Sequence, residues 1–293
     1  MKVPVTDNAW ESRLEDAVSA INNNNCFLFS ANQDAASVGA LVALGLYLIR
    51  LDKKVFLSLP DPIVSSYDYL DKIIQYNYLR VVDSENAIKL ITDQVEAVIF
   101  FDTPNSSQIP FFSCISENIL SRGPTVIEID HHFGNDSQEI FPGEIKLFRQ
   151  VDATAEIVAD LLLKLFEKHS ALPDPLKQRN ILLSLATGWL GDTAGGKGVH
   201  NKQDHDRWMA LFRKNLDEVT YDSDESGDIK TKKFKSPEDI IEYFDLVSSA
   251  SAAQETYQRA IKSEYTPIRS EEAGPESEAQ EEGGGGEGGE GVP

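Results

Sequence analysis

Four aspartates and a pair of adjacent histidines stand where a strand or a helix is expected to end. They are Asp34, Asp102, Asp130, His131, His132 and Asp192. A single aspartate after a strand is usually a helix cap or a turn residue. Four of them together with two histidines favour a metal site, because carboxylate and imidazole ligands suit Mn²⁺, Mg²⁺ or Zn²⁺. We therefore expect divalent-metal chemistry.

Short apolar runs alternate with helical patterns through the first part of the chain. Strands are expected at residues 26–29, 54–59, 81–82, 95–101 and 125–129, and helices at residues 38–50, 67–76, 85–91 and 109–121. This alternation predicts an α/β fold with a doubly wound, mostly parallel sheet and helices on both faces. Such sheets bind ligands at the carboxyl ends of their strands, which is where Asp34, Asp102 and Asp130 are expected.

The sequence becomes helical after residue 151. Helices are expected at residues 153–169, 175–189, 205–219 and 236–263, with Asp192 just past the second of them. From residue 270 onward the composition is Glu, Gly, Ser and Pro, which predicts disorder. The expected organisation is a catalytic-type domain at residues 1–198, a helical extension at 199–269 and a disordered acidic tail at 270–293.

The chain is acidic, with a formal net charge of −21 over 293 residues. Part of this excess is local, since residues 271–293 contain eight Glu and no Lys or Arg. A negative surface argues against tight binding to duplex nucleic acid. Bound divalent cations would still let an acidic protein hold phosphates, because they supply the positive charge locally.

Apolar runs are too short to cross a bilayer, and the N-terminal residues contain no stretch of signal-peptide length. We therefore expect a cytoplasmic protein without a membrane partner. The two cysteines, Cys26 and Cys114, are each isolated in the sequence. This spacing predicts reduced structural thiols rather than a disulfide framework or a thiolate metal site.

Four stretches around the acidic residues resemble, in order and spacing, the four motifs of the DHH phosphoesterase superfamily. They are FLFSANQDAASVGAL, VIFFDTPN, VIEIDHH and GWLGDTAGG. The segment VDATAEIVADLL also resembles the family's helix between its third and fourth motifs. This superfamily includes oligoribonucleases, single-strand exonucleases, exopolyphosphatases, cyclic-dinucleotide phosphodiesterases and family II pyrophosphatases. The match covers roughly residues 25–195, about the size of a domain.

The resemblance implies an active site that binds two Mn²⁺ ions. It makes Asp102 the carboxylate that bridges them, and Asp34 a ligand of the first ion. His131 and Asp192 become ligands of the second ion.

The resemblance also gives roles to the other two residues of the Asp-His-His stretch. His132 would lie near the substrate phosphate, and Asp130 would orient a histidine, as carboxylates beside metal ligands commonly do.

The first motif departs from the family pattern His-x-x-x-Asp-x-Asp. Ser30 stands in place of the histidine, and Ala36 in place of the second aspartate. Each implied metal site loses one ligand. The second site keeps Asp102, His131 and Asp192. We therefore expect one bound Mn²⁺, with Mg²⁺ as an alternative, rather than two ions.

The expected function is metal-dependent hydrolysis of phosphodiester or phosphoanhydride bonds in nucleotides, short oligonucleotides or polyphosphate, at an impaired or single-metal site. The alternative is a catalytically defective pseudoenzyme that binds nucleotides or phosphate, or serves as an interaction module. The Gly-Gly-Gly-His stretch of the family's C-terminal substrate-binding domain is absent, and Gly195-Gly196 is followed by Lys197. Substrate recognition through a homodimer or a protein partner is therefore left open.

Overall fold

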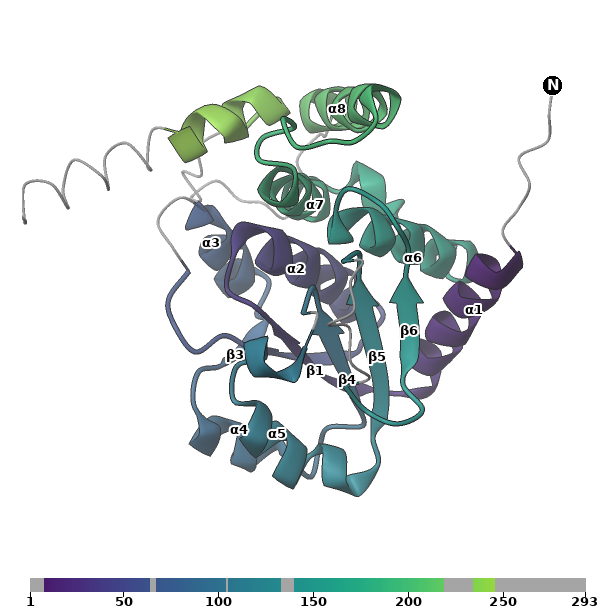
Figure 1. Cartoon of the computed structure of the whole chain (residues 1–293), viewed down its shortest axis with the longest axis vertical. Helices are drawn as coiled ribbons and strands as arrows, with labels where there is room; N and C mark the ends of the chain where they lie inside the picture. Colours follow the sequence, from purple (N-terminus) through teal and green to yellow (C-terminus); the bar gives the residue numbers. More distant parts are fainter. Residues whose placement is uncertain (1–7, 64–66, 104, 133–139, 219–233, 246–293) are drawn as a thin grey trace, which may run out of the picture. The chain divides into compact units, whose positions relative to one another are not determined.

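The computed structural model describes residues 8–63, 67–103, 105–132, 140–218 and 234–245 (Figure 1). The chain divides into two compact units, residues 1–249 and 250–293. All described residues belong to the first unit, so the acidic tail predicted at residues 270–293 lies outside the part of the chain that the structure describes.

One six-stranded sheet forms the centre of the first unit, and all its strands run parallel. Their order across the sheet is β3-β2-β1-β4-β5-β6. In chain order they are β1 (Cys26–Ala31), β2 (Lys54–Ser58), β3 (Arg80–Val82), β4 (Ala97–Phe101), β5 (Thr125–Asp130) and β6 (Ile145–Phe148). From β1 the chain adds β2 and β3 towards one edge of the sheet, and β4, β5 and β6 follow on the other side of β1. Parallel sheets bind ligands where the strand order changes in this way, here between β1 and β4.

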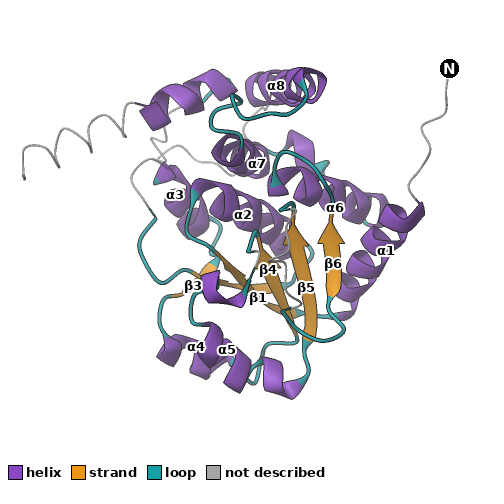
Figure 2. Ribbon diagram, in the orientation of Figure 1, coloured by secondary structure: helices purple, strands orange, loops and turns teal. Residues whose placement is uncertain are grey.

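Helices cover both faces of the sheet, as Figure 2 shows. They are α1 (Asn8–Asn23), α2 (Ala35–Arg50), α3 (Tyr69–Tyr76), α4 (Glu85–Ile91), α5 (Phe112–Asn118), α6 (Thr154–Lys168), α7 (Arg179–Asp192) and α8 (Lys202–Glu218). Single 3₁₀ turns lie at Ser106–Gln108, Leu120–Arg122 and Pro175–Lys177. Residues 237–245 are also helical, and the rest of the helix predicted at residues 236–263 lies outside the described residues.

Each face of the sheet has its own hydrophobic core, because successive strand residues point to opposite faces. The larger core holds Phe27 and Phe29 of β1 against α2, α6 and α7. The smaller core holds Leu28 and Phe100 against α4 and α5. Strands buried on both faces have near-continuous apolar sequences, which is why β1 and β4 could be predicted.

Helices α2 and α7 approach each other closely because their contact is made of small residues. An added Cβ on Gly39 would lie 2.4 Å from the backbone nitrogen of Gly188. One on Gly191 would lie 2.7 Å from the backbone nitrogen of Ala36. Only glycine fits at these two points, and α7 is thereby held against the beginning of α2.

The predicted fold class is confirmed, and four details differ from the predictions. Neither α1 nor β6 was expected. The helix predicted at residues 109–121 is shorter, since α5 spans Phe112–Asn118. Asp192 was expected just past a helix but is the last residue of α7, so this helix carries the aspartate directly.

The helices after residue 198 add to the larger core rather than packing separately. Trp208 and Phe212 of α8 are buried there, as are Phe234 and Ile240 of the next segment. The domain boundary predicted at residue 198 stays a prediction. In the described ranges, no helix combines the length and apolar character that a membrane span needs.

Candidate metal centre

Asp102 follows β4 directly and lies at the centre of the candidate site. Its backbone nitrogen donates to the carbonyl oxygen of Ile129 at 2.9 Å, which extends the pairing of β4 with β5 by one residue. Its φ of 53° is in the left-handed region, which costs a non-glycine residue roughly 1–2 kcal/mol. The chain therefore leaves the strand direction at the residue whose carboxylate forms the centre.

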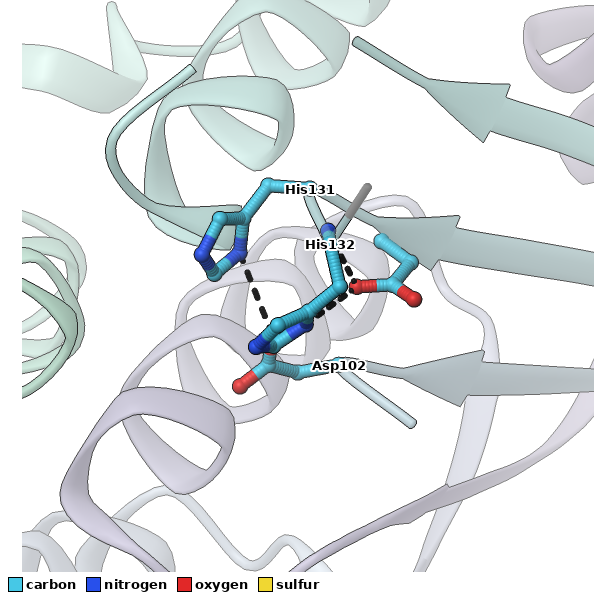
Figure 3. A group of neighbouring side chains, drawn as sticks. Asp102, His131 and His132 are labelled. Carbon is cyan, nitrogen blue, oxygen red and sulfur yellow. Dashed lines mark hydrogen bonds and ion pairs between the residues drawn. The ribbon is translucent and has the colours of Figure 1, made fainter. Parts of the chain in front are cut away.

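Both carboxylate oxygens of Asp102 accept hydrogen bonds, and the residue is 6% exposed. Oδ1 accepts from the Thr154 hydroxyl at 2.8 Å, and Oδ2 accepts from the Ser37 hydroxyl at 3.1 Å. The Nδ1 atoms of His131 and His132 each lie 3.3 Å from Oδ1 (Figure 3). Four groups from α2, α6 and the end of β5 thus converge on one buried carboxylate.

Asp130, the last residue of β5, orients His132. Its Oδ1 accepts from the His132 backbone nitrogen at 3.0 Å and lies 2.8 Å from the Nδ1 atom of the same ring. The His132 side chain is 46% exposed and that of His131 only 14%. Of the two adjacent rings, His132 is the one that solvent or a ligand can reach.

Asp192 reaches the same group of side chains from the end of α7. Its Oδ2 accepts from the backbone nitrogen of Thr154, the first residue of α6, at 2.9 Å. The same oxygen lies 3.8 Å from His131 Nδ1. The first N–H groups of a helix have no partner inside it, so a carboxylate is a favourable partner for one of them.

Asp34 lies at the edge of the centre and is exposed. It is the N-cap of α2, and its Oδ1 accepts from the backbone nitrogen of Ser37 at 2.8 Å. The Ser37 hydroxyl in turn donates to Asp102, so one residue lies between the two aspartates. The structure brings Asp102, His131 and Asp192 into direct proximity and connects Asp34 to them through Ser37.

Burial and hydrogen bonding act in opposite directions on the two buried aspartates. Burial would raise the pKa of Asp102, but hydrogen bonds from His131, His132 and Thr154 hold it well below its usual value. The pKa of Asp192 is raised to about 8 by burial and by the negative charge of Asp102. His131 and the Thr154 backbone N–H offset this only in part.

Both histidines hold their protons more strongly than a free imidazole. The pKa of His132 is raised to about 10 by its hydrogen bonds with Asp102 and Asp130. Burial would lower the pKa of His131, but Asp102 and Asp192 raise it above its ordinary value. In the absence of a cation, protons on these rings balance the buried carboxylates.

A divalent cation fits this set of donors. Asp102, Asp130, His131 and His132 each offer a ligand atom, and these atoms lie within 4.8 Å of one another; Asp34 and Asp192 are not in this group. In the described residues, the ion pairs of Asp102 and Asp192 are with histidines and not with Lys or Arg. Carboxylate and imidazole donors with no fixed cation nearby suit a first-row divalent metal.

The two positions that depart from the DHH pattern are buried and offer no strong ligand. Ser30 is fully buried on β1, and its hydroxyl has no hydrogen-bond partner in the described part of the chain. Ala36 is 6% exposed, and Gly191 packs against its backbone. Neither side chain can replace a histidine or a carboxylate as a metal ligand.

Two residues of the network, Ser37 and Thr154, were not among the predicted site residues. Each is a single hydroxyl in the first turn of a helix, where serine and threonine usually act as caps. The signal for Thr154 was its place in the VDATAEIV segment between two motifs. Nothing in the sequence indicated that its hydroxyl would contact Asp102.

Comparisons with known proteins give a structural match but no sequence match. No family model and no curated protein matches this sequence. The structure resembles an exopolyphosphatase-related protein from Bacteroides fragilis, with a TM-score of 0.56 and 14% identity over 73% of this chain. This chain spans 62% of that protein, which is less than two thirds of its length.

Two further solved structures are similar at lower scores. A putative family II inorganic pyrophosphatase from Methanococcus jannaschii has a TM-score of 0.43 at 16% identity, covering 64% of this chain and 54% of its own. RecJ from Thermus thermophilus, in complex with Mn²⁺, has a TM-score of 0.41 at 12% identity, covering 92% of this chain and 41% of its own. The predicted resemblance to the DHH phosphoesterases is confirmed at the level of the fold, on the first of these three matches.

Proposed function

We propose that this protein is a metal-dependent phosphoesterase of the DHH type that works with one divalent ion, held by Asp102, His131 and Asp192. The observation that carries the proposal is the buried Asp102 carboxylate with two imidazole Nδ1 atoms 3.3 Å from it. A divalent ion would take the place of the protons that balance this carboxylate, and the fold around it resembles that of an exopolyphosphatase-related protein. Mn²⁺ is the proposed ion, with Mg²⁺ as the alternative.

A bound divalent ion would polarise a phosphoryl oxygen as a Lewis acid. His132 is exposed, and its pKa of about 10 keeps it protonated at neutral pH. It can therefore donate a hydrogen bond to a phosphate oxygen. Asp130 holds the ring in place through its Oδ1, so the donor is oriented before substrate arrives.

The proposed substrates are nucleotides, short oligonucleotides or polyphosphate, rather than duplex nucleic acid. The net charge of −21 disfavours contact along an extended phosphate backbone. Nearly all of the centre is buried, and His132 is the group that a phosphate can reach. A short phosphorylated ligand meets both conditions.

An assay of the full chain tests this function. It measures hydrolysis of pyrophosphate, polyphosphate and a dinucleotide, once with Mn²⁺ and once with a chelator. We expect Mn²⁺-dependent product release in the wild type and a loss of about 100-fold or more in Asp102→Asn, because several kcal/mol of transition-state stabilisation depend on the ion. Asp206→Asn is the matched control, since Asp206 lies on the surface of α8 and pairs with Lys202. Equal rates in both variants would contradict the proposal.

A catalytically defective binding module is the second candidate, and Ser30 and Ala36 favour it. The double variant Ser30→His with Ala36→Asp tests it by restoring the two missing ligands. If missing ligands limit the reaction, the variant should gain about tenfold or more in Mn²⁺-dependent hydrolysis. A variant that folds and binds two ions but stays inert would favour the binding module. A brisk wild-type rate would exclude that module.

A further inference from the structure

Thr154 contacts three of the groups that carry the proposed function, and each belongs to a different element. Its hydroxyl lies 2.8 Å from Asp102 Oδ1, which follows β4, and 2.8 Å from His131 Nδ1, which follows β5. Its backbone nitrogen donates to Asp192 Oδ2, at the end of α7. Thr154 itself is fully buried at the first position of α6.

The direction of these hydrogen bonds follows from the number of protons available. A threonine hydroxyl has one proton to donate and lone pairs to accept with. An ionised Asp102 can only accept, so the Thr154 proton goes to Asp102 Oδ1. The contact with His131 must then run the other way, with Nδ1–H donating to the hydroxyl oxygen.

Two carboxylates lie on the same side of the His131 ring as this hydroxyl. Oxygens of Asp102 and Asp192 lie 3.3 and 3.8 Å from His131 Nδ1. Figure 3 shows this edge of the ring turned towards Asp102. Thr154 therefore lies at the point where the three groups that would share the proposed ion meet.

We propose that Thr154 is a positioning residue of the candidate metal centre. Its hydroxyl holds Asp102 Oδ1 and contacts His131 Nδ1. Its backbone N–H holds Asp192. The proposal rests on the proposed function for its metal, but the metal affinity can be measured without any hydrolysis.

Thr154→Val is the most informative variant because it removes the hydroxyl and keeps both the shape and the backbone N–H. Thr154→Ser restores the hydroxyl. Thr187→Val is the matched control, since Thr187 is a fully buried threonine of α7 whose hydroxyl bonds to Leu183 and Tyr69. Thermal melting of the metal-free proteins establishes that each variant folds.

Thr154→Ala is the second variant, for the case that Thr154→Val does not fold. It also removes the hydroxyl and keeps the backbone N–H.

The readout is Mn²⁺ affinity by calorimetry. Groups that support metal ligands typically account for about 10- to 100-fold in affinity, so we expect a loss of that size in Thr154→Val. Thr154→Ser and Thr187→Val should stay close to wild type. Unchanged affinity in Thr154→Val would contradict the positioning role. A wild type that binds Mn²⁺ as expected but hydrolyses nothing would refute the proposed function alone.

Discussion

Replacing Gly39 by alanine should separate α2 from α7 and weaken the metal centre at the same time. The added Cβ would lie 2.4 Å from the Gly188 nitrogen and 2.6 Å from the Ser184 carbonyl oxygen. Both atoms belong to backbone, so no side chain can rotate away. An ordinary contact needs roughly 3.5 Å between such atoms, and the two helices must therefore separate by about 1 Å.

Gly45→Ala in the same helix is the matched control. Its Cβ would lie 3.1 Å from Leu79 Cδ2, the end of a flexible side chain. Both substitutions gain the same helix propensity, about 1 kcal/mol. The difference between them isolates the cost of overpacking, about 1–3 kcal/mol. For a protein of this size, 1 kcal/mol corresponds to roughly 2–4 °C, so Gly39→Ala should melt roughly 2–12 °C below Gly45→Ala.

The Mn²⁺ affinities of the two variants should follow the same order as their melting temperatures. Helix α2 carries Ser37, which donates to Asp102 at 3.1 Å, and α7 carries Asp192. A separation of about 1 Å breaks such a hydrogen bond, so Mn²⁺ affinity should fall about tenfold or more in Gly39→Ala. Gly45→Ala should bind as the wild type does. Equal melting temperatures for the two variants, or a destabilised Gly39→Ala with full affinity, would refute this reasoning.

Two further predictions concern other parts of the chain. Burial, together with Glu144, raises the pKa of Glu128 from 4.5 to about 8. Because the unfolded chain releases this proton first, Glu128 lowers stability as pH rises from about 4.5 to about 8. The melting temperature of Glu128→Gln should therefore fall less than that of the wild type as the pH rises over this range. Equal falls in the two proteins would contradict the raised pKa of Glu128. Deleting residues 270–293 should leave the melting temperature unchanged, because a Glu/Gly segment has little apolar surface to bury. A clear fall would contradict that prediction.

The strands that could be predicted are the ones buried on both faces. β4 is apolar at every position. β6 could not be predicted, because it is a short edge strand of four residues, and its Lys146 pairs with Glu128 and Glu144. α1 is polar on average and buries only a stripe that includes Trp10 and Leu14. Both elements depend on packing partners that are distant in the sequence.

The site residues also divide into those that the sequence could locate and those that it could not. Asp102, Asp130 and the adjacent histidines could be located because each follows a strand, and the register of a parallel sheet brings strand ends together. The contact of Asp102 with Thr154 and Ser37 could not, since it depends on how α2 and α6 pack over the sheet. The roles of Asp34, Asp102, His131 and Asp192 as metal ligands stay a prediction.

Titration of the metal-free full chain with Mn²⁺ by calorimetry tests the central claim most directly. The account predicts one tight ion per chain, bound with release of protons from the His131 and Asp192 region, since both have a raised pKa. Binding should be lost in His131→Ala and kept in His169→Ala, because His169 ends α6 and bonds to Asn22. Two tight ions, no tight ion, or undiminished binding in His131→Ala would contradict it.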